Sequence, residues 1–316
     1  MKDLRPVVAR DDVTRLLEGI FDEPIHALAA VEGGQVARTY AFRTGSDAYF
    51  LSINRRLGSN VEKLALIERL LRPTGIPVPP IVRRGQMGEL HYVVTRRMPG
   101  APAAELDRTG LEALAPSLMT TIDAIHTVDV RGSSGYGPAG DDGNGLYPSW
   151  RRYLEQVIGE EEEWDFFGRW HVLFETTILE RDVFERVYRR MTDLLSHCPE
   201  ERRLIHGNIG YNNVLTQDGM ITAVLDWQDA GYGDPLYDVA QLDFWDPGGG
   251  WAGRFFDRST AQGRGVTSYD ERIRCYQLYT VLNALRFFAK KGDEGAYRWV
   301  RERLDELDGG GDFRPM

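Results

Sequence analysis

One histidine, two asparagines and an aspartate are spaced in a way that suits phosphoryl transfer. His206, Asn208 and Asn213 follow one another at intervals of two and five residues, and Asp226 comes later in the same segment. Phosphoryl transfer needs a residue that orients the attacking hydroxyl, and an amide and a carboxylate that hold Mg²⁺ on the nucleotide phosphates. In one loop pattern of this kind, the orienting residue lies two positions after a histidine and five before the metal-binding asparagine. The spacing therefore predicts phosphoryl-transfer chemistry.

Asn208 stands where this pattern has an aspartate. An aspartate can accept a hydrogen bond from the attacking hydroxyl and then its proton, whereas a neutral amide is a far weaker base. Losing a positioned general base typically lowers a rate by about 10²–10⁴-fold. We therefore expect this chain to bind nucleotide and acceptor but to turn over slowly.

A predicted hairpin positions the two metal-binding candidates. Residues 212–227 alternate apolar and polar side chains around Asp218-Gly219, a dipeptide typical of tight hairpin turns. Asn213 and Asp226 flank the two strands and should therefore lie near the same end of the hairpin.

The N-terminal third has the pattern of a small sheet with one helix. Residues 26–44 and 48–56 alternate as strands around a turn at residues 45–47, and residues 91–98 form another β-rich run. Residues 61–75 show helical spacing up to Pro73 and Gly75, which predicts a helix packed on the sheet. Pro99, Gly100 and Pro102 then interrupt regular structure, so we predict a lobe of residues 1–97 followed by a lobe of residues 98–316.

The second lobe is predicted to be mainly helical. Residues 111–129 and 179–198 carry long helical patterns, and the glycine-rich stretch 133–145 separates them. The fold class is therefore α+β, with a small β-sheet lobe and a larger helical lobe.

Composition excludes several classes of partner. The chain has 316 residues, 42% of them hydrophobic, and a formal charge of −10, which disfavours nucleic acid. Neither a signal-peptide segment nor an apolar run long enough to cross a membrane is present, so we expect a cytoplasmic, monomeric protein without a membrane partner. Cys198 and Cys275 lack metal-ligand spacing and are expected to be ordinary thiols.

Several motifs resemble the aminoglycoside phosphotransferase family, particularly its hygromycin B branch. They are EGGQVARTYAF near residue 32, HYVVTRRMPG near 91, SSGYGP near 133, LYPSWRRYL near 146, and residues 203–245 with the sequence GDP at 233–235. The resemblance implies a two-lobed protein-kinase-like fold, ATP or GTP and Mg²⁺ as cofactors, and an antibiotic hydroxyl as the phosphate acceptor.

The same resemblance assigns roles within residues 203–245. Asn213 and Asp226 resemble the Mg²⁺ ligands, and His206 resembles a residue that organises the loop without touching substrate. Asp238, in a helical pattern, resembles the acid that braces this loop through backbone hydrogen bonds. Asp234 is expected to cap a turn.

Nucleotide-binding positions are implied in the first lobe, each with an alternative. Glu32, Gly33 and Gly34 lie where a strand-turn-strand covers the phosphates, although they also suit an ordinary hairpin turn. Arg97 and Met98 lie at the hinge, or simply in a linker between the lobes. Glu62 either pairs with a phosphate-binding cation or lies on a solvated helix face.

Ser52 departs from the family pattern. Its strand position usually carries a lysine or arginine that holds the phosphates, and a serine hydroxyl cannot neutralise their charge. Arg55, Arg56 and Lys63 are nearby cations that could replace it.

Acidic and aromatic residues are candidates for the acceptor site. Asp229, Glu160 and Glu161 could pair with ammonium groups of an amino sugar, or the glutamates could be a solvated helix face. Trp164, together with Phe166, Phe167 and Trp170, could instead line a pocket for a flatter natural product such as a nucleoside antibiotic, or could belong to the core.

Three functions remain to be compared. The leading one is a small-molecule phosphotransferase that confers antibiotic resistance, with its aspartate replaced by Asn208 to trap a substrate complex. The second is a naturally degenerate kinase-like protein that only binds. A protein kinase is disfavoured because no Ala-Pro-Glu segment follows Asp226.

Overall fold

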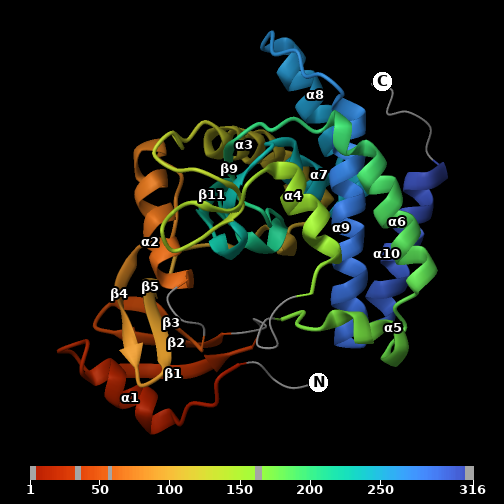
Figure 1. Cartoon of the computed structure of the whole chain (residues 1–316). Helices are drawn as coiled ribbons and strands as arrows, with labels where there is room; N and C mark the ends of the chain where they lie inside the picture. Colours follow the sequence, from red (N-terminus) through yellow and green to blue (C-terminus); the bar gives the residue numbers. More distant parts are fainter. Residues whose placement is uncertain (1–4, 33–36, 56–58, 161–165, 310–316) are drawn as a thin grey trace.

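The computed structural model describes residues 5–32, 37–55, 59–160 and 166–309, and it has two lobes (Figure 1). The helices are α1 (Arg10–Glu18), α2 (Ser59–Leu71), α3 (Arg108–His126), α4 (Trp150–Glu155), α5 (Leu173–Thr176), α6 (Arg181–Leu194), α7 (Leu236–Trp245), α8 (Trp251–Ala261), α9 (Tyr269–Lys291) and α10 (Glu294–Gly309). The strands are β1 (Ile25–Val31), β2 (Arg38–Thr44), β3 (Asp47–Asn54), β4 (Ile81–Met87), β5 (Leu90–Arg96), β6 (Ala101–Pro102), β7 (Tyr136–Ala139), β8 (Gly145–Tyr147), β9 (Arg203–Ile205), β10 (Val214–Gln217), β11 (Met220–Val224) and β12 (Gly231–Gly233).

The N-terminal lobe is built on a five-stranded antiparallel sheet in the order β1-β2-β3-β5-β4. The β2–β3 hairpin turns at Gly45, as predicted, with a φ of 55° and with Thr44 paired to Asp47. The run predicted at 26–44 comprises β1 and β2, which pair antiparallel in agreement with the strand-turn-strand pattern expected around Glu32.

Alternation along β3 gives the sheet one face that packs on α1 and one that does not. Leu51 and Ile53 are fully buried in a small core, together with Val13 and Leu17 of α1. Because successive side chains of a strand point to opposite faces, Ser52 lies on the face away from this core.

Helix α2 contacts the sheet, as predicted, and it is also anchored in the other lobe, which was not predicted. Its buried side chains Ile67 and Leu71 belong to the hydrophobic core of the C-terminal lobe. The segment that follows continues this attachment, since the Val224 N–H donates to the Pro77 carbonyl over 2.8 Å. In Figure 1, α2 rises from the sheet beside the C-terminal lobe.

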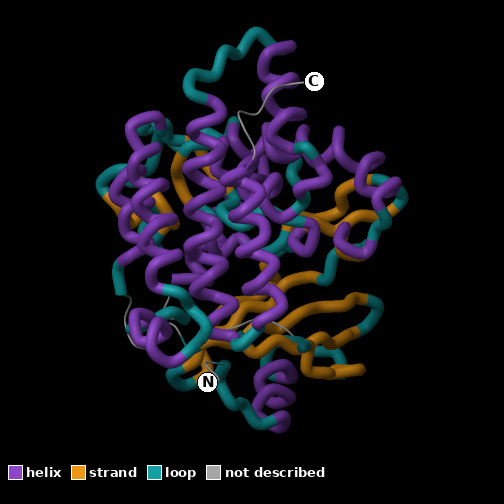
Figure 2. Tube along the Cα trace, turned by 90° about the vertical axis from the view of Figure 1, so that its right-hand side faces the viewer, coloured by secondary structure: helices purple, strands orange, loops and turns teal. Residues whose placement is uncertain are grey.

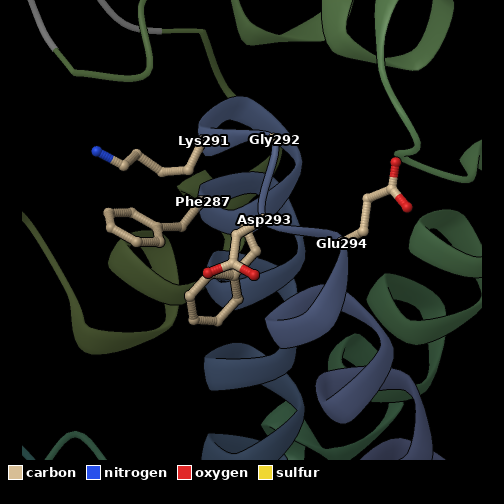
Figure 3. A pocket seen from close by; sticks show the side chains of 6 residues that line it. Phe287, Lys291, Gly292, Asp293 and Glu294 are labelled. Atoms are coloured by element: carbon tan, nitrogen blue, oxygen red, sulfur yellow. The ribbon is translucent and has the colours of Figure 1, made fainter.

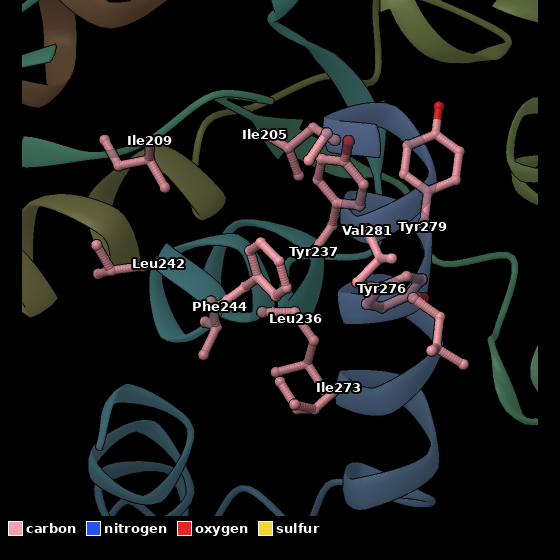
Figure 4. Close-up of a cluster of buried hydrophobic side chains, with 14 of the residues drawn as sticks. Ile205, Ile209, Leu236, Tyr237, Leu242, Phe244, Ile273, Tyr276, Tyr279 and Val281 are labelled. Carbon is pink, nitrogen blue, oxygen red and sulfur yellow. The ribbon is translucent and has the colours of Figure 1, made fainter. Parts of the chain in front are cut away.

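The C-terminal lobe is mainly helical, as predicted (Figure 2), and α9 contacts α6, α7 and α10. Figure 4 shows Tyr237 and Phe244 of α7 in one apolar cluster with Ile273 and Tyr276 of α9. Trp170 also lies in this core with 1% of its surface exposed, so of its two predicted roles the core role is observed.

Two small sheets in this lobe support the loops between helices. Their orders are β11-β10-β6 and β8-β7-β12-β9. Strand β6 follows directly from the linker after β5 and pairs with β10, so the linker contacts the predicted hairpin. Gly100 has a φ of 99°, and a Cβ there would lie 2.6 Å from the Thr216 carbonyl oxygen. In the part of the chain that the structure describes, no helix combines the length and apolar character needed to cross a bilayer.

Candidate active site

The β10–β11 hairpin brings Asn213 and Asp226 to one end of a short sheet. Asp218 and Gly219 have φ values of 52° and 74°, the left-handed geometry that a two-residue hairpin turn requires. Val214 pairs with Val224, and the Leu225 N–H donates to the Asn213 carbonyl over 2.7 Å. The two candidate metal ligands therefore flank adjacent ends of paired strands.

His206 organises the loop that follows β9 through both ring nitrogens. Its Nδ1 accepts a hydrogen bond from the Asn208 N–H over 3.2 Å, so the proton resides on Nε2, which donates to the Leu225 carbonyl over 2.9 Å. The ring is fully buried beside Trp227, and burial lowers the pKa of the imidazole. His206 is therefore a neutral residue that ties the loop to the end of β11.

Asp238 of α7 holds the first residues of this loop. Its carboxylate accepts hydrogen bonds from the N–H groups of His206 and Gly207, each over 2.9 Å, and lies 3.0 Å from Nε2 of His126. Burial alone would raise the pKa of Asp238, but the hydrogen bond and the charge of His126, aided by His206, lower it. The carboxylate therefore stays ionised and accepts from two backbone donors at once.

Gly207 is required by the backbone of the loop. It has a φ of 79°, and a Cβ there would lie 2.3 Å from the Asp229 carbonyl oxygen. The loop and the 3₁₀ turn Trp227–Asp229 thus touch through their backbones, which only glycine permits.

The side chain of Asn213 is hydrogen-bonded to the backbone of Asn208, whereas the side chain of Asn208 is exposed. The Asn213 Nδ2 donates to the Asn208 carbonyl over 2.8 Å. The amide nitrogen is thus engaged, and the Asn213 Oδ1 is the atom that would bind a metal. Asn208 is exposed, and its side chain makes no hydrogen bond to any residue that the structure describes. It is therefore accessible to an acceptor hydroxyl.

Asp226 completes a pair of oxygen ligands that suits Mg²⁺. It is exposed and has a left-handed backbone with a φ of 58°, a conformation that aspartate tolerates better than most residues. Carboxylate and amide oxygens are hard ligands of the kind Mg²⁺ prefers, and Mg²⁺ is usually held by one or two carboxylates together with substrate phosphates. Among the described residues, no cluster of three or more His, Cys, Asp or Glu side chains could hold a metal alone. The donor set therefore fits a metal that is shared with a nucleotide.

Asp229 and Lys63 add charge next to this pair. The surrounding protein, and secondly the charge of Asp226, raise the pKa of Asp229 to about 6, while Lys63 opposes the rise. Lys63 is only 3% exposed, and its ammonium donates to the carbonyl of Gln228. A lysine from α2 thus lies between the two lobes.

The other predicted nucleotide positions are spread over the N-terminal lobe. Ser52 lies in β3, paired with Val93. The Arg97 N–H donates to the Ala48 carbonyl over 2.8 Å, and Met98 beside it is half-buried. Glu32 is exposed after β1, and the predicted Gly33 and Gly34 lie outside the described residues.

Glu62 has a partner other than a phosphate-binding cation. Its carboxylate forms a 2.9 Å ion pair with Arg84 of β4, and both side chains are exposed. The pairing places Glu62 on the solvated side of α2, which is the second of its two predicted roles.

The acceptor candidates fall in two places. Glu160 is exposed and lies 3.4 Å from Nδ1 of His171, whereas Asp229 adjoins the loop. Glu161 and Trp164 lie outside the described residues. Phe166 stacks on Phe287 of α9 with a centroid distance of 5.3 Å.

A pocket of about 580 Å³ lies where α9 meets α10, and Phe287 is among its lining residues (Figure 3). The remaining lining residues are Phe288, Lys291, Gly292, Asp293 and Glu294. Its mixture of rings and charges could hold a polar ligand, and Phe287 connects it to the segment that follows the acidic run.

Asp234 does more than cap a turn. Its Oδ1 accepts from the Leu236 N–H over 3.0 Å, which is a turn cap, and its carboxylate also receives two hydrogen bonds from Arg272 and one from Tyr276, at 2.5–2.8 Å. The GDP segment is therefore tied to α9.

Sequence reasoning missed the roles of Arg272, Tyr276 and His126. Their partners Asp234 and Asp238 lie 38, 42 and 112 residues away along the chain. No local pattern connects residues at such separations, although Arg272 and Tyr276 are four positions apart and so share a helix face.

Most of the chain is similar in sequence to known phosphotransferases and kinases. The profile of the phosphotransferase enzyme family matches residues 27–274. Hygromycin-B 4-O-kinase of Escherichia coli is 29% identical over 313 residues, covering 96% of this chain and 86% of the relative. A probable ketoamine kinase of Vibrio parahaemolyticus is 26% identical over 281 residues, covering 85% and 89%.

Solved structures extend the similarity to three dimensions. A crystal structure of aminoglycoside phosphotransferase APH(4)-Ia with ADP and hygromycin B has a TM-score of 0.76 at 29% identity, covering 95% of this chain and 99% of that one. Spectinomycin phosphotransferase, at 15% identity and a TM-score of 0.64 over 96% and 98% of the two chains, shares the fold.

Proposed function

The chain belongs to the phosphotransferase enzyme family, and from this premise we propose that it moves the terminal phosphate of ATP or GTP to a hydroxyl of an aminoglycoside or a related antibiotic. Such a reaction would confer resistance on a cell that contains it. We propose that it acts in the cytoplasm as a monomer on a small molecule.

The observation that carries the proposal is the convergence of three oxygen-bearing side chains on one loop and one hairpin end. Asn208 is exposed, the Asn213 amide is oriented by the Asn208 carbonyl, and Asp226 follows the strand whose end pairs with Asn213. This is the set that phosphoryl transfer needs, apart from the missing carboxylate at Asn208.

The chain's own residues orient the reactants. The Asn213 Oδ1 and the Asp226 carboxylate would hold Mg²⁺, which spreads the charge of the phosphate oxygens when it is bound. His206 and Asp238 keep the loop in place, so that Asn208 presents its carbonyl oxygen to the acceptor hydroxyl. An amide can accept this hydrogen bond but does not take the proton as the new bond forms.

Asp229 is the candidate for recognising a cationic acceptor. Its carboxylate adjoins Asp226 and has a raised pKa, so an ammonium group placed beside it would relieve repulsion between the two acids. The similarity to hygromycin-B 4-O-kinase makes an amino-sugar antibiotic the first acceptor to test. A nucleoside-type natural product is the alternative if the rings of Phe166 and Phe287 form part of the site.

The test compares the chain with Asn208→Asp. We expect the variant to transfer phosphate from ATP or GTP to hygromycin B, or to another member of an aminoglycoside panel, about 10²–10⁴-fold faster than the parent. The nucleotide KM should change little because Asn208 makes no nucleotide contact in this mechanism. Initial rates of nucleoside diphosphate release, with phosphorylated product identified by mass spectrometry, give both quantities.

Two other outcomes would replace the proposal. If Asn208→Asp binds nucleotide with Mg²⁺ but modifies no member of the panel, the chain is a binding protein of kinase shape, a possibility that Ser52 favours. If nucleoside-type acceptors alone are phosphorylated, the acceptor class is wrong while the reaction stands.

A further inference from the structure

The nucleotide phosphates would meet no cation from β3. Strand β3 contains no lysine or arginine; Ser52 lies on its face opposite the α1 core, and a serine hydroxyl cannot neutralise phosphate charge. The inference below rests on the proposed function, because it concerns the nucleotide that this function requires.

Two neighbouring arginines lie on the sheet face opposite Ser52. Arg38 pairs directly with Ile53, so it lies on the same face as the α1 core. Arg55 is exposed and lines a groove of about 750 Å³ together with Val8 and Asp12 at α1. Arg56 lies outside the described residues.

Lys63 of α2 lies next to the segment that contains Asp226. It is 3% exposed, and its ammonium donates to the carbonyl of Gln228, two residues after Asp226. It also lies within electrostatic range of Asp229 and His206, since its charge acts on both groups. Lys63 therefore belongs to the group of charges around the candidate metal site.

We propose that Lys63 is the cation that binds the nucleotide phosphates, so that in this chain the role of the β3 lysine or arginine has moved to α2. A lysine ammonium has three N–H donors in tetrahedral directions. One donates to the Gln228 carbonyl, and in the nucleotide-bound state the ammonium would donate to phosphate oxygens.

The attachment of α2 explains why this position can serve. Ile67 and Leu71 bury α2 in the core of the C-terminal lobe, so Lys63 is held relative to Asp226 by the same lobe. Lys63 lies four positions before Ile67, which places both on one face of the helix. A β3 cation would instead move with the sheet.

The experiment separates phosphate recognition from adenosine recognition. Dissociation constants of ADP, ATP and adenosine are measured by calorimetry for the parent, Lys63→Met, and Lys63→Met combined with Ser52→Lys. We expect Lys63→Met to weaken ADP and ATP binding about 10–100-fold while adenosine binding changes less than about 3-fold. Ser52→Lys should restore most of the loss, because it returns a cation to the strand.

Arg55→Met is the matched control, since it removes a nearby cation from the opposite face of the sheet. Its ADP, ATP and adenosine constants should stay within about 3-fold of the parent values. Equal weakening of all three ligands by Lys63→Met would assign Lys63 a purely structural role and overturn the inference.

A second measurement observes Lys63 in the unmodified chain and needs a conservative variant only to assign its signal. The sequence contains four lysines, at positions 2, 63, 290 and 291, so lysine-selective ¹⁵N or ¹³C labelling gives few side-chain signals. The Lys63 signal, assigned by its loss in Lys63→Arg, should shift on addition of ADP and stay in place with adenosine. A Lys63 signal that ignores ADP refutes the inference, whereas a parent chain that binds no nucleotide refutes the proposed function as well.

Discussion

Asp229 is a residue whose ionisation opposes folding. The surrounding protein and the neighbouring charge of Asp226 raise its pKa to about 6, above the ordinary value of 3.8. Between these two values the folded chain binds the proton more strongly than the unfolded chain. The destabilising effect of Asp229 is therefore absent below about pH 4, grows as pH rises, and is complete above about pH 6.

Replacing this carboxylate should therefore stabilise the fold only at neutral pH. We expect Asp229→Asn to raise Tm by about 1–2 °C at pH 7.5, a small gain because part of the side chain reaches solvent. The gain should disappear near pH 4. Thermal melts at half-unit steps of pH check this, with Asp218→Asn as a control that removes a charge from an exposed hairpin turn. A gain that is the same at pH 4 and 7.5 would show that ionisation is not its cause.

Two arginine–aspartate ion pairs should differ in how much they stabilise the fold. Arg272 of α9 and Asp234 of the GDP segment form a two-bond pair whose side chains are 5% and 0% exposed. Arg131 and Asp129 form a pair of the same chemistry, also with two bonds, but their side chains are 91% and 59% exposed. Arg131 lowers the pKa of Asp129, yet water screens this interaction.

The two pairs should consequently respond differently to the same substitution. Arg272→Met leaves the Asp234 carboxylate buried without its charge partner, and we expect a loss of about 3–5 kcal/mol in unfolding free energy. Arg131→Met should leave that free energy unchanged within error. Urea titrations of both variants measure the difference, and similar losses would mean that the buried pair does not fasten the GDP segment to α9.

At the scale of the whole molecule, the two hydrophobic cores do not divide the chain where the lobes were predicted to meet, because α2 precedes residue 98 but packs in the larger core. The N-terminal sheet and α1 enclose one small core, whereas α2 contributes Ile67 and Leu71 to the much larger core of the C-terminal lobe. The helix therefore links the sheet to the segment around Gln228. Local unfolding of the sheet should leave α2 and the β10–β11 hairpin in place.

Cavity substitutions in the two cores should test this division. Leu51→Ala and Ile67→Ala each remove a buried aliphatic side chain, and we expect each to lower the unfolding free energy by about 2–5 kcal/mol. Hydrogen exchange followed by mass spectrometry should show faster exchange in β1–β5 for Leu51→Ala, and in α2 and the β10–β11 hairpin for Ile67→Ala. Faster exchange over both lobes in each variant would argue for a single cooperative unit.

Much of the fold was predictable because it depends on neighbours along the chain. The left-handed turns at Gly45 and at Asp218-Gly219 follow from residues that tolerate positive φ, and the strands and helices around them follow from periods of 2 and 3.6. The spacing of His206, Asn208 and Asn213, together with motifs that resemble a known family, indicated the chemistry. The strand-turn-strand pattern around Glu32 likewise predicted that residues 26–44 contain two strands.

By itself, then, the sequence determined the kind of lobes, the role of His206 and Asp238 in holding one loop, and the departures from the family pattern at Asn208 and Ser52. Only the tertiary structure decided that Arg272 and Tyr276 of α9 hold Asp234 and that Lys63 reaches Gln228, 165 residues away along the chain. The physical reason is that the spacing of apolar residues specifies which face of a helix or strand is buried. It does not specify which other element that face packs against. Packing of α2 on the C-terminal core made that choice, and with it placed an ammonium beside Asp229.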